Sequence, residues 1–237
     1  MKKLFIIANW KSNKTIEETE EWLHDFSDGF NKANIKSEDK KTIIAPPFTS
    51  LEHARYCSRN LKLSLEFAAQ DVSTFNEGAY TGEVSAKQIK ELADYVIVGH
   101  SERRQNLGED EDVVHKKLEQ VFKYELIPIL CVSNFDQVQS SKFKVQSYSS
   151  KFKVNNRVLI AYEPLFAIGS GKPDTPESAD EMGKKIKETL GETPVLYGGS
   201  VTSENVASFT RMPHIDGVLV GGASLDPLEF LEIIKNA

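Results

Sequence analysis

Eight short apolar runs, separated by stretches with helical periodicity, constrain the fold more than any other feature of this chain. Each run is rich in Ile, Val and Leu and nearly continuous, which is typical of strands buried on both faces. Together they predict a parallel sheet, and with eight units in one domain closure into a (β/α)₈ barrel is favoured over an open doubly wound sheet. The runs occupy residues 3–9, 41–47, 63–70, 95–100, 126–132, 157–163, 193–199 and 216–222.

Helices are expected between these runs. Residues 15–26 and 109–124 carry apolar side chains at helical spacing. Thr15, Ser85 and Thr175 are residue types that commonly begin helices, and acidic residues lie near them. We see no low-complexity linker, so residues 1–237 are predicted to form a single domain.

Composition limits the classes of partner. The net charge is −6, from 29 basic and 35 acidic residues, which argues against nucleic acid or an anionic membrane as the main partner. The only cysteines, Cys57 and Cys131, cannot form a disulfide framework or a structural zinc site by themselves. The N-terminal apolar run is too short for a signal peptide and no run approaches a membrane span, so a cytoplasmic protein is expected.

Polar residues gather at the carboxyl ends of the predicted strands, where parallel barrels carry their active sites. Taken singly, each has an ordinary interpretation: an exposed lysine, a core histidine, a capping acid, a tight turn. Their convergence on one rim of a barrel predicted from other residues makes a functional site the better interpretation. The residues are Asn9 and Lys11 after the first run, His100 and Glu102 after the fourth, Glu163 after the sixth, Gly198-Gly199-Ser200 after the seventh and Gly221-Gly222 after the eighth.

Two glycine-rich segments indicate an anion site and a lid. Glycines after the last two strands let backbone N–H groups approach a ligand closely, and many barrels bind phosphate there. Residues 164–173 have apolar side chains in the middle, glycines after them and proline at both ends. That composition suits a mobile lid that sheds water and closes over a phosphate.

These motifs make the chain resemble the triosephosphate isomerase family from end to end. VGHSERR at 98–104 and AYEPLFAIGSGK at 161–172 are the most specific of them. The remaining matches are ANWKSN at 8–13, FNEGAYTGE at 75–83, YGGSV at 197–201 and DGVLVGGASL at 216–225. The resemblance implies interconversion of dihydroxyacetone phosphate and glyceraldehyde 3-phosphate through an enediolate, with no metal or cofactor.

The resemblance also assigns roles. Glu163 would be the base, neutral His100 the electrophile that polarises the carbonyl, and Lys11 and Asn9 the groups that stabilise the enediolate oxygen. Glu102 would orient Lys11. The phosphate would be held by backbone N–H groups of Gly169, Ser200, Gly221 and Gly222.

Residues 75–83 resemble the family's interdigitating loop. The loop would insert into a second copy of the chain and place Thr81 near the active site there, completing it in a homodimer. In a monomer, the aromatic side chains of Phe75 and Tyr80 would be exposed to solvent.

The sequence departs from the family pattern in the lid and the fifth strand. Phe166 stands where the family has tryptophan, and Asn134 where it has the glutamate that accepts the indole N–H bond. We hypothesise that both partners of this one lid hydrogen bond have been replaced together. The 134–156 region is also short, so we expect its helix to be truncated or irregular.

Two other functions remain open at this point. The chain could be another phosphate-binding barrel isomerase acting on a larger sugar phosphate, although the short lid suits a three-carbon substrate. It could also be a catalytically silent barrel that acts as a binding protein, but Lys11, His100 and Glu163 are all present.

Overall fold

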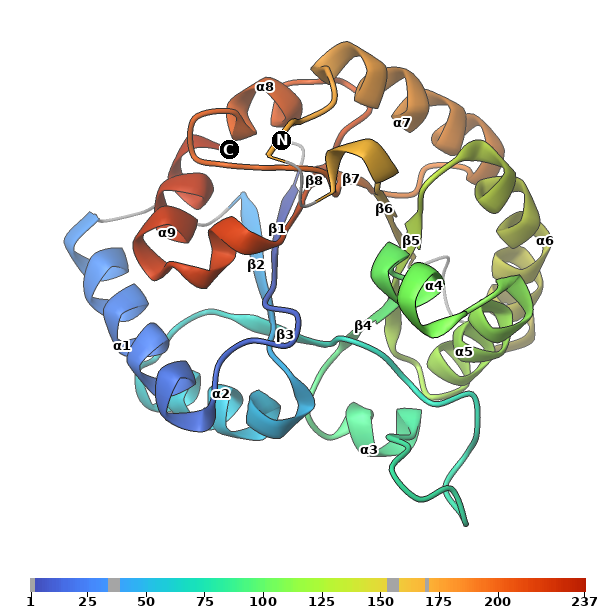
Figure 1. Cartoon of the computed structure of the whole chain (residues 1–237), viewed down its shortest axis with the longest axis horizontal. Helices are drawn as coiled ribbons and strands as arrows, with labels where there is room; N and C mark the ends of the chain where they lie inside the picture. The colour runs from blue at the N-terminus through green and yellow to red at the C-terminus, as the bar shows by residue number, and fades with distance from the viewer. Residues whose placement is uncertain (1–2, 34–38, 153–157, 169–170) are drawn as a thin grey trace.

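The computed structural model describes residues 3–33, 39–152, 158–168 and 171–237. Within these residues eight parallel strands close into one barrel in sequence order, with helices around it (Figure 1). β1 pairs with β2 on one side and with β8 on the other, so the first and last strands complete the ring. The predicted (β/α)₈ barrel is confirmed.

The elements follow the predicted order closely. The strands are β1 (Leu4–Asn9), β2 (Lys40–Ala45), β3 (Glu66–Ala69), β4 (Tyr95–Val98), β5 (Ile127–Val132), β6 (Leu159–Tyr162), β7 (Val195–Tyr197) and β8 (Gly217–Val220). The α-helices are α1 (Ile16–Ala33), α2 (Phe48–Asn60), α3 (Ala86–Lys90), α4 (Ser101–Leu107), α5 (Glu111–Lys123), α6 (Phe135–Phe152), α7 (Pro176–Leu190), α8 (Val206–Thr210) and α9 (Pro227–Asn236). Two 3₁₀ turns, η1 (Leu165–Ala167) and η2 (Gly222–Leu225), follow β6 and β8. Among the described helices, none has both the length and the apolarity of a bilayer span.

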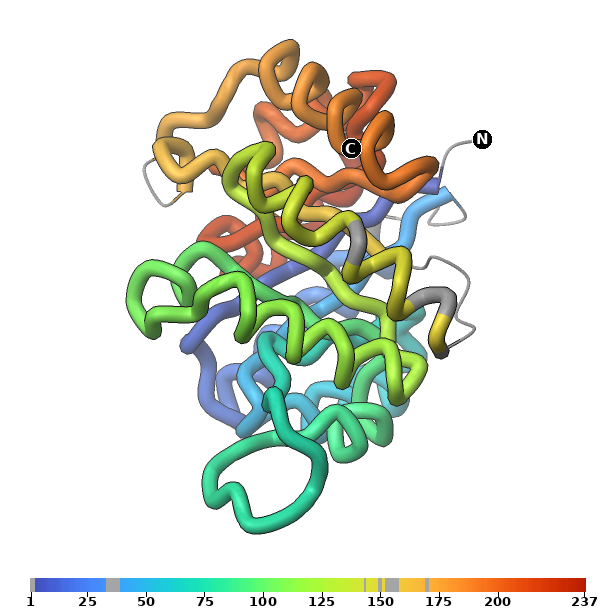
Figure 2. Tube along the Cα trace, turned by 90° about the vertical axis from the view of Figure 1, so that its right-hand side faces the viewer, coloured from blue at the N-terminus to red at the C-terminus, as the bar shows by residue number. Residues whose placement is uncertain are grey.

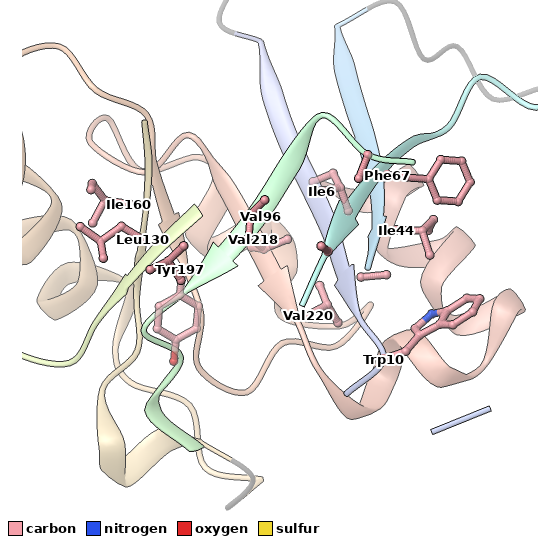
Figure 3. Close-up of a cluster of buried hydrophobic side chains, with 14 of the residues drawn as sticks. Ile6, Trp10, Ile44, Phe67, Val96, Leu130, Ile160, Tyr197, Val218 and Val220 are labelled. Atoms are coloured by element: carbon pink, nitrogen blue, oxygen red, sulfur yellow. The ribbon is translucent and has the colours of Figure 1, made fainter. Parts of the chain in front are cut away.

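The strands form continuous apolar runs in the sequence because both of their faces are buried. In β4, Val96 and Val98 belong to the large cluster that lies between strands and helices, part of which is drawn in Figure 3. Tyr95 and Ile97 alternate with them and belong to a second cluster, made of strand residues, that fills the barrel. The side-chain period of two in a strand therefore divides each run between two cores.

Capping fixes where the helices begin. The Glu18 N–H donates to Thr15 Oγ1 and the Thr15 N–H to the Glu18 carboxylate, a reciprocal capping box before α1. Ser85 forms the same kind of box ahead of α3, and Thr175 caps α7. The three helix starts predicted from sequence are thus confirmed.

The expectation of a truncated or irregular helix in the 134–156 region is wrong. α6 runs over 18 residues and packs between α5 and α7. Its buried side is small and partly polar, with Val138, Ser141 and Val145 spaced at helical intervals among serines and lysines. The expectation rested on the short length of the region, but its described part, up to Phe152, still forms a long helix because packing on neighbouring helices sustains it.

Closure of the barrel depends on a glycine at the β1–β8 seam. A Cβ at Gly217 would lie 2.0 Å from the carbonyl oxygen of Phe5, a backbone atom that cannot move without breaking the strand pair. We expect Gly217→Ala to lower the free energy of unfolding by about 3 kcal/mol. Gly108→Ala is the control, because its φ is +68° but none of the described residues comes within 4 Å of the added Cβ.

Urea unfolding of both variants measures the difference. The Gly108→Ala variant should lose only about 1 kcal/mol, the usual cost of a left-handed alanine. Equal losses in the two variants would show that the clash at the seam is absorbed and that closure does not depend on Gly217.

Candidate active site

Side chains at alternate positions of each strand point into the barrel, so the polar residues that follow the strands point into its mouth. Asn9 continues the inward series of Ile7, and Glu163 that of Ala161. Both residues are buried, and both line a cavity of about 250 Å³ at the carboxyl ends of the strands. Of the residues predicted from sequence, this cavity brings together Asn9, Lys11, His100, Glu163, Ser200, Gly221 and Gly222.

Glu163 is the most buried charged side chain of the cavity, with 1% of its surface exposed. Its Oε2 accepts a 2.9 Å hydrogen bond from the backbone N–H of Ser101, and its Oε1 lies 3.0 Å from His100 Nε2. These two donors offset the cost of burying a carboxylate. Gly198 also packs closely against the Glu163 side chain, because a Cβ on Gly198 would lie only 3.0 Å from Glu163 Cγ.

His100 is held as a neutral donor by the start of α4. It is the N-cap residue of that helix, and its Nδ1 accepts the N–H of Glu102 at 3.3 Å. A nitrogen that accepts this bond carries no proton, so the proton of the neutral ring is assigned to Nε2, the nitrogen that faces Glu163.

Lys11 occupies a strained backbone conformation that its neighbours enforce. Its φ is +53°, the left-handed region that costs a residue with a side chain about 1 kcal/mol. The Lys11 N–H donates to Asn9 Oδ1 at 3.1 Å, and Gln70 Nε2 donates to the Lys11 carbonyl at 2.8 Å. The ammonium group contacts the carboxylate of Glu102, the partner expected from sequence. These contacts aim Lys11 into the mouth.

Sequence reasoning missed Gln70 and the backbone of Ser101. Gln70 directly follows β3, so it could have been found as the other residues were, as a polar residue at the end of a predicted strand. The contribution of Ser101 comes from its main chain, which its residue type does not reveal.

The candidate phosphate cradle lines the same cavity, and a Cβ on Gly221 would lie 3.4 Å from Lys11 Cε. Ser200, Gly221 and Gly222 line it after β7 and β8, and η2 begins at Gly222. Ser200 Oγ donates to the carbonyl oxygen of Ala167 at 2.7 Å, which ties the candidate lid to the end of β7. The other predicted phosphate ligand, Gly169, lies outside the described residues.

The two ends of the lid differ in their contacts. At the near end, Leu165 and Phe166 are 50% and 65% exposed. At the far end, the Asp174 N–H donates to the Tyr197 hydroxyl at 2.8 Å, and Tyr197 stacks on Phe209 with ring centroids 3.9 Å apart. Burial raises the pKa of Tyr197 to about 12, so the phenol stays protonated.

Asn134 has a structural partner that the sequence did not predict. Its Oδ1 accepts the N–H of Gln137 at 3.0 Å, as an N-cap of α6 does. The residue therefore stabilises a helix start at the position where the family pattern has a lid contact.

Cys131 packs inside the barrel, as expected from its apolar strand. Burial, and then the negative charge of neighbouring Glu163, raise the pKa of its thiol well above the usual range. Cys131 is therefore a neutral thiol beside the carboxylate and is not an activated nucleophile.

Thr81 is the predicted site residue that the single chain does not bring to the cavity. It lies in the loop 75–83, which is exposed and projects from the body of the molecule between β3 and α3 (Figure 2). A second cavity, of about 400 Å³, adjoins the first and is lined by Asn9 and Lys11 together with Phe48, Arg103 and Leu107.

Comparisons with known proteins all point to one family. The sequence pattern of the family described as triosephosphate isomerase matches residues 4–237. A triosephosphate isomerase of Mesomycoplasma hyopneumoniae strain 7448 is 43% identical, with all of both chains covered. Those of Dictyoglomus turgidum and Aquifex aeolicus are each 38% identical, over 100% and 98% of both chains. A barrel with this site and full-length relatives of one name place the chain in the triosephosphate isomerase family.

Proposed function

We propose that this protein, as one barrel domain over residues 1–237, interconverts dihydroxyacetone phosphate and glyceraldehyde 3-phosphate. The observation that carries the proposal is the meeting of the Glu163 carboxylate, the His100 Nε2 donor and the Lys11 ammonium at one cavity. A buried carboxylate can take a proton from carbon next to a carbonyl, and the other two groups stabilise the negative oxygen that results.

The steps follow from the positions of these groups. Glu163 removes a proton from C1 of dihydroxyacetone phosphate while His100 and Asn9 donate hydrogen bonds to the oxygens. The electron pair moves into the C1–C2 double bond, and Lys11 offsets the enediolate charge. The carbonyl electron pair passes to O2, and the proton on O1 is transferred to O2, a transfer that His100 Nε2 is placed to relay. Glu163 then returns a proton to C2 as the C1–O1 carbonyl forms. The charge on the intermediate is met by side chains, so the proposed reaction uses no metal or cofactor.

Lid closure and base positioning are proposed to be one event. Glu163 immediately precedes Pro164, where the lid begins, and its carboxylate now rests on the Ser101 N–H. To reach a substrate carbon it must leave that amide. The same movement brings the backbone of the lid toward the cradle of Ser200, Gly221 and Gly222, with Gly169 as the proposed fourth phosphate ligand.

The proposed working form is a homodimer. The loop 75–83 carries Phe75 and Tyr80, whose rings stack with their centroids 4.1 Å apart and whose side chains are each nearly half exposed. The second cavity beside Lys11 offers a matching recess, edged by the exposed Leu107. Insertion of a second copy's loop would bury these side chains and bring Thr81 of that copy toward Lys11.

We also propose that the protein acts in the cytoplasm. Both cysteines are buried free thiols, as expected of a protein in a reducing compartment.

Removing the base tests the proposed chemistry. We expect Glu163→Gln to lower kcat by about 10²- to 10⁴-fold, because the amide keeps the shape and the Ser101 contact but cannot accept the proton. A coupled assay with dihydroxyacetone phosphate measures it, with Glu181→Gln on the surface of α7 as the matched control. A Glu163→Gln enzyme with undiminished kcat would remove Glu163 from the reaction.

The dimer can be tested at the rim of the second cavity. Leu107→Glu should raise the dimer Kd by about 100-fold or more and lower activity with it, because a charge would be buried against the inserted loop. Leu228→Glu on α9 is the matched control, since Leu107 and Leu228 are 62% and 57% exposed. Analytical ultracentrifugation provides the masses. The dimer proposal fails if the unmodified protein sediments as a monomer at micromolar concentration, or if both variants remain dimers.

The joint replacement of both partners in one lid hydrogen bond predicts coupling between positions 134 and 166. Phe166→Trp and Asn134→Glu together should change kcat or KM by about tenfold more than the two single effects combined, the value of one hydrogen bond to a carboxylate. Asn134→Glu alone should cost about 1 kcal/mol of stability through removal of the α6 cap. Asn134→Asp, which keeps a capping oxygen, controls for that cost. Additive effects on the kinetics would reject the idea.

A further inference from the structure

A cluster of three potential ligands lies outside the active site, on the faces by which α1 and α2 pack together. His53 Nε2 lies 3.0 Å from Glu20 Oε2 and 3.3 Å from Cys57 Sγ. One ligand atom from each of the three side chains lies within 4.8 Å of the other two. None of the three lines the catalytic cavity.

The spacing of the cluster follows from helix geometry. His53 and Cys57 are four residues apart on α2, so they occupy the same face one turn apart. Glu20 comes from α1, which packs on α2 and lies beside it in Figure 1. His24 is one turn further along α1, with its Nε2 3.9 Å from Glu20 Oε1. Two packed helices thus each present an i, i+4 pair of ligand types.

The protein alone leaves this cluster poorly satisfied, because both neighbours of His53 contact the same ring nitrogen. If Nε2 carries a proton it can donate to Glu20, and the Cys57 thiol then has no acceptor there. If Nε2 is bare it can accept from Cys57, but its lone pair then faces the Glu20 carboxylate. A catalytic relay needs partners on two different ring nitrogens, so the arrangement does not fit a nucleophilic triad.

A cation at the centre of the three atoms removes this conflict. We propose that Glu20, His53 and Cys57 form a binding site for a borderline-soft divalent ion, with Zn²⁺ as the best match. Zinc takes imidazole, thiolate and carboxylate ligands at about 2.0–2.3 Å, which places tetrahedral ligand atoms about 3.3–3.6 Å apart. The two short contacts of His53 would therefore widen by only a few tenths of an ångström around the ion. The fourth position is open to water, because Glu20 is half exposed.

Binding would release a proton. Burial, and then the charge of Glu20, raise the pKa of the Cys57 thiol, so without a metal the sulfur holds its proton. The ion forms a bond to sulfur as the S–H bond breaks, and the proton passes to solvent. The neutral imidazole and the ionised carboxylate bind without further proton transfer.

Cobalt titration of the purified full-length protein tests the site. Co²⁺ replaces Zn²⁺ in such sites and reports a cysteine ligand through a thiolate-to-cobalt charge-transfer band. We expect that band to saturate at about one ion per chain, to vanish on addition of Zn²⁺ and to resist excess Mg²⁺, which avoids sulfur. Cys57→Ser should abolish the band, and His53→Gln and Glu20→Gln should each weaken cobalt binding about tenfold or more.

Glu21→Gln is the matched control, since it makes the same charge change at the next, exposed position of α1. It should bind cobalt as the unmodified protein does. Circular dichroism of each variant establishes whether it is folded. If Cys57→Ser does not fold, His53→Gln tests the site in its place. Absence of the band in the unmodified protein, its persistence in Cys57→Ser, or equal weakening by Glu20→Gln and Glu21→Gln would overturn the proposal.

Discussion

The first two backbone amides of α4 organise the proposed catalytic groups. A helix leaves its first N–H groups without partners inside the helix. Here the Ser101 N–H holds the Glu163 carboxylate, and the Glu102 N–H holds His100 Nδ1. The Glu102 side chain adds a third link, because its carboxylate contacts the Lys11 ammonium. One helix start therefore sets the position of the carboxylate, the tautomer of the imidazole and the direction of the lysine.

This arrangement separates what is rigid from what must move. His100 and Lys11 are fixed by several hydrogen bonds each, and Lys11 is held in a strained conformation that contacts from Asn9 and Gln70 maintain. Glu163 sits at the junction between β6 and the lid, and two hydrogen-bond partners hold it where it is. In the proposed mechanism the electrophile and the cation are thus preorganised, whereas the base rests on a helix terminus until the lid moves.

Sequence periodicity was sufficient to predict the barrel, because strands buried on both faces leave a pattern that few other folds produce. The strand ends then identified the groups at the mouth, since each of these is a distinctive side chain at a fixed place. Contributions made through the main chain, such as the Ser101 N–H, could not be predicted from residue types. The length of α6 was predicted wrongly for a different reason: the segment between β5 and β6 is short, and only the structure shows that it still holds an 18-residue helix packed against α5 and α7.

In the proposed mechanism Glu163 leaves the start of α4 to reach the substrate. A crystal structure with a bound phosphorylated two-carbon acid, whose carboxylate mimics the enediolate, would reveal this movement. We expect a closed lid, with the inhibitor's carboxylate between His100 Nε2 and Lys11, and the Glu163 carboxylate no longer bonded to the Ser101 N–H but about 3 Å from the inhibitor. A closed lid with Glu163 still on Ser101 and out of reach of the ligand would show that the base does not move in this way.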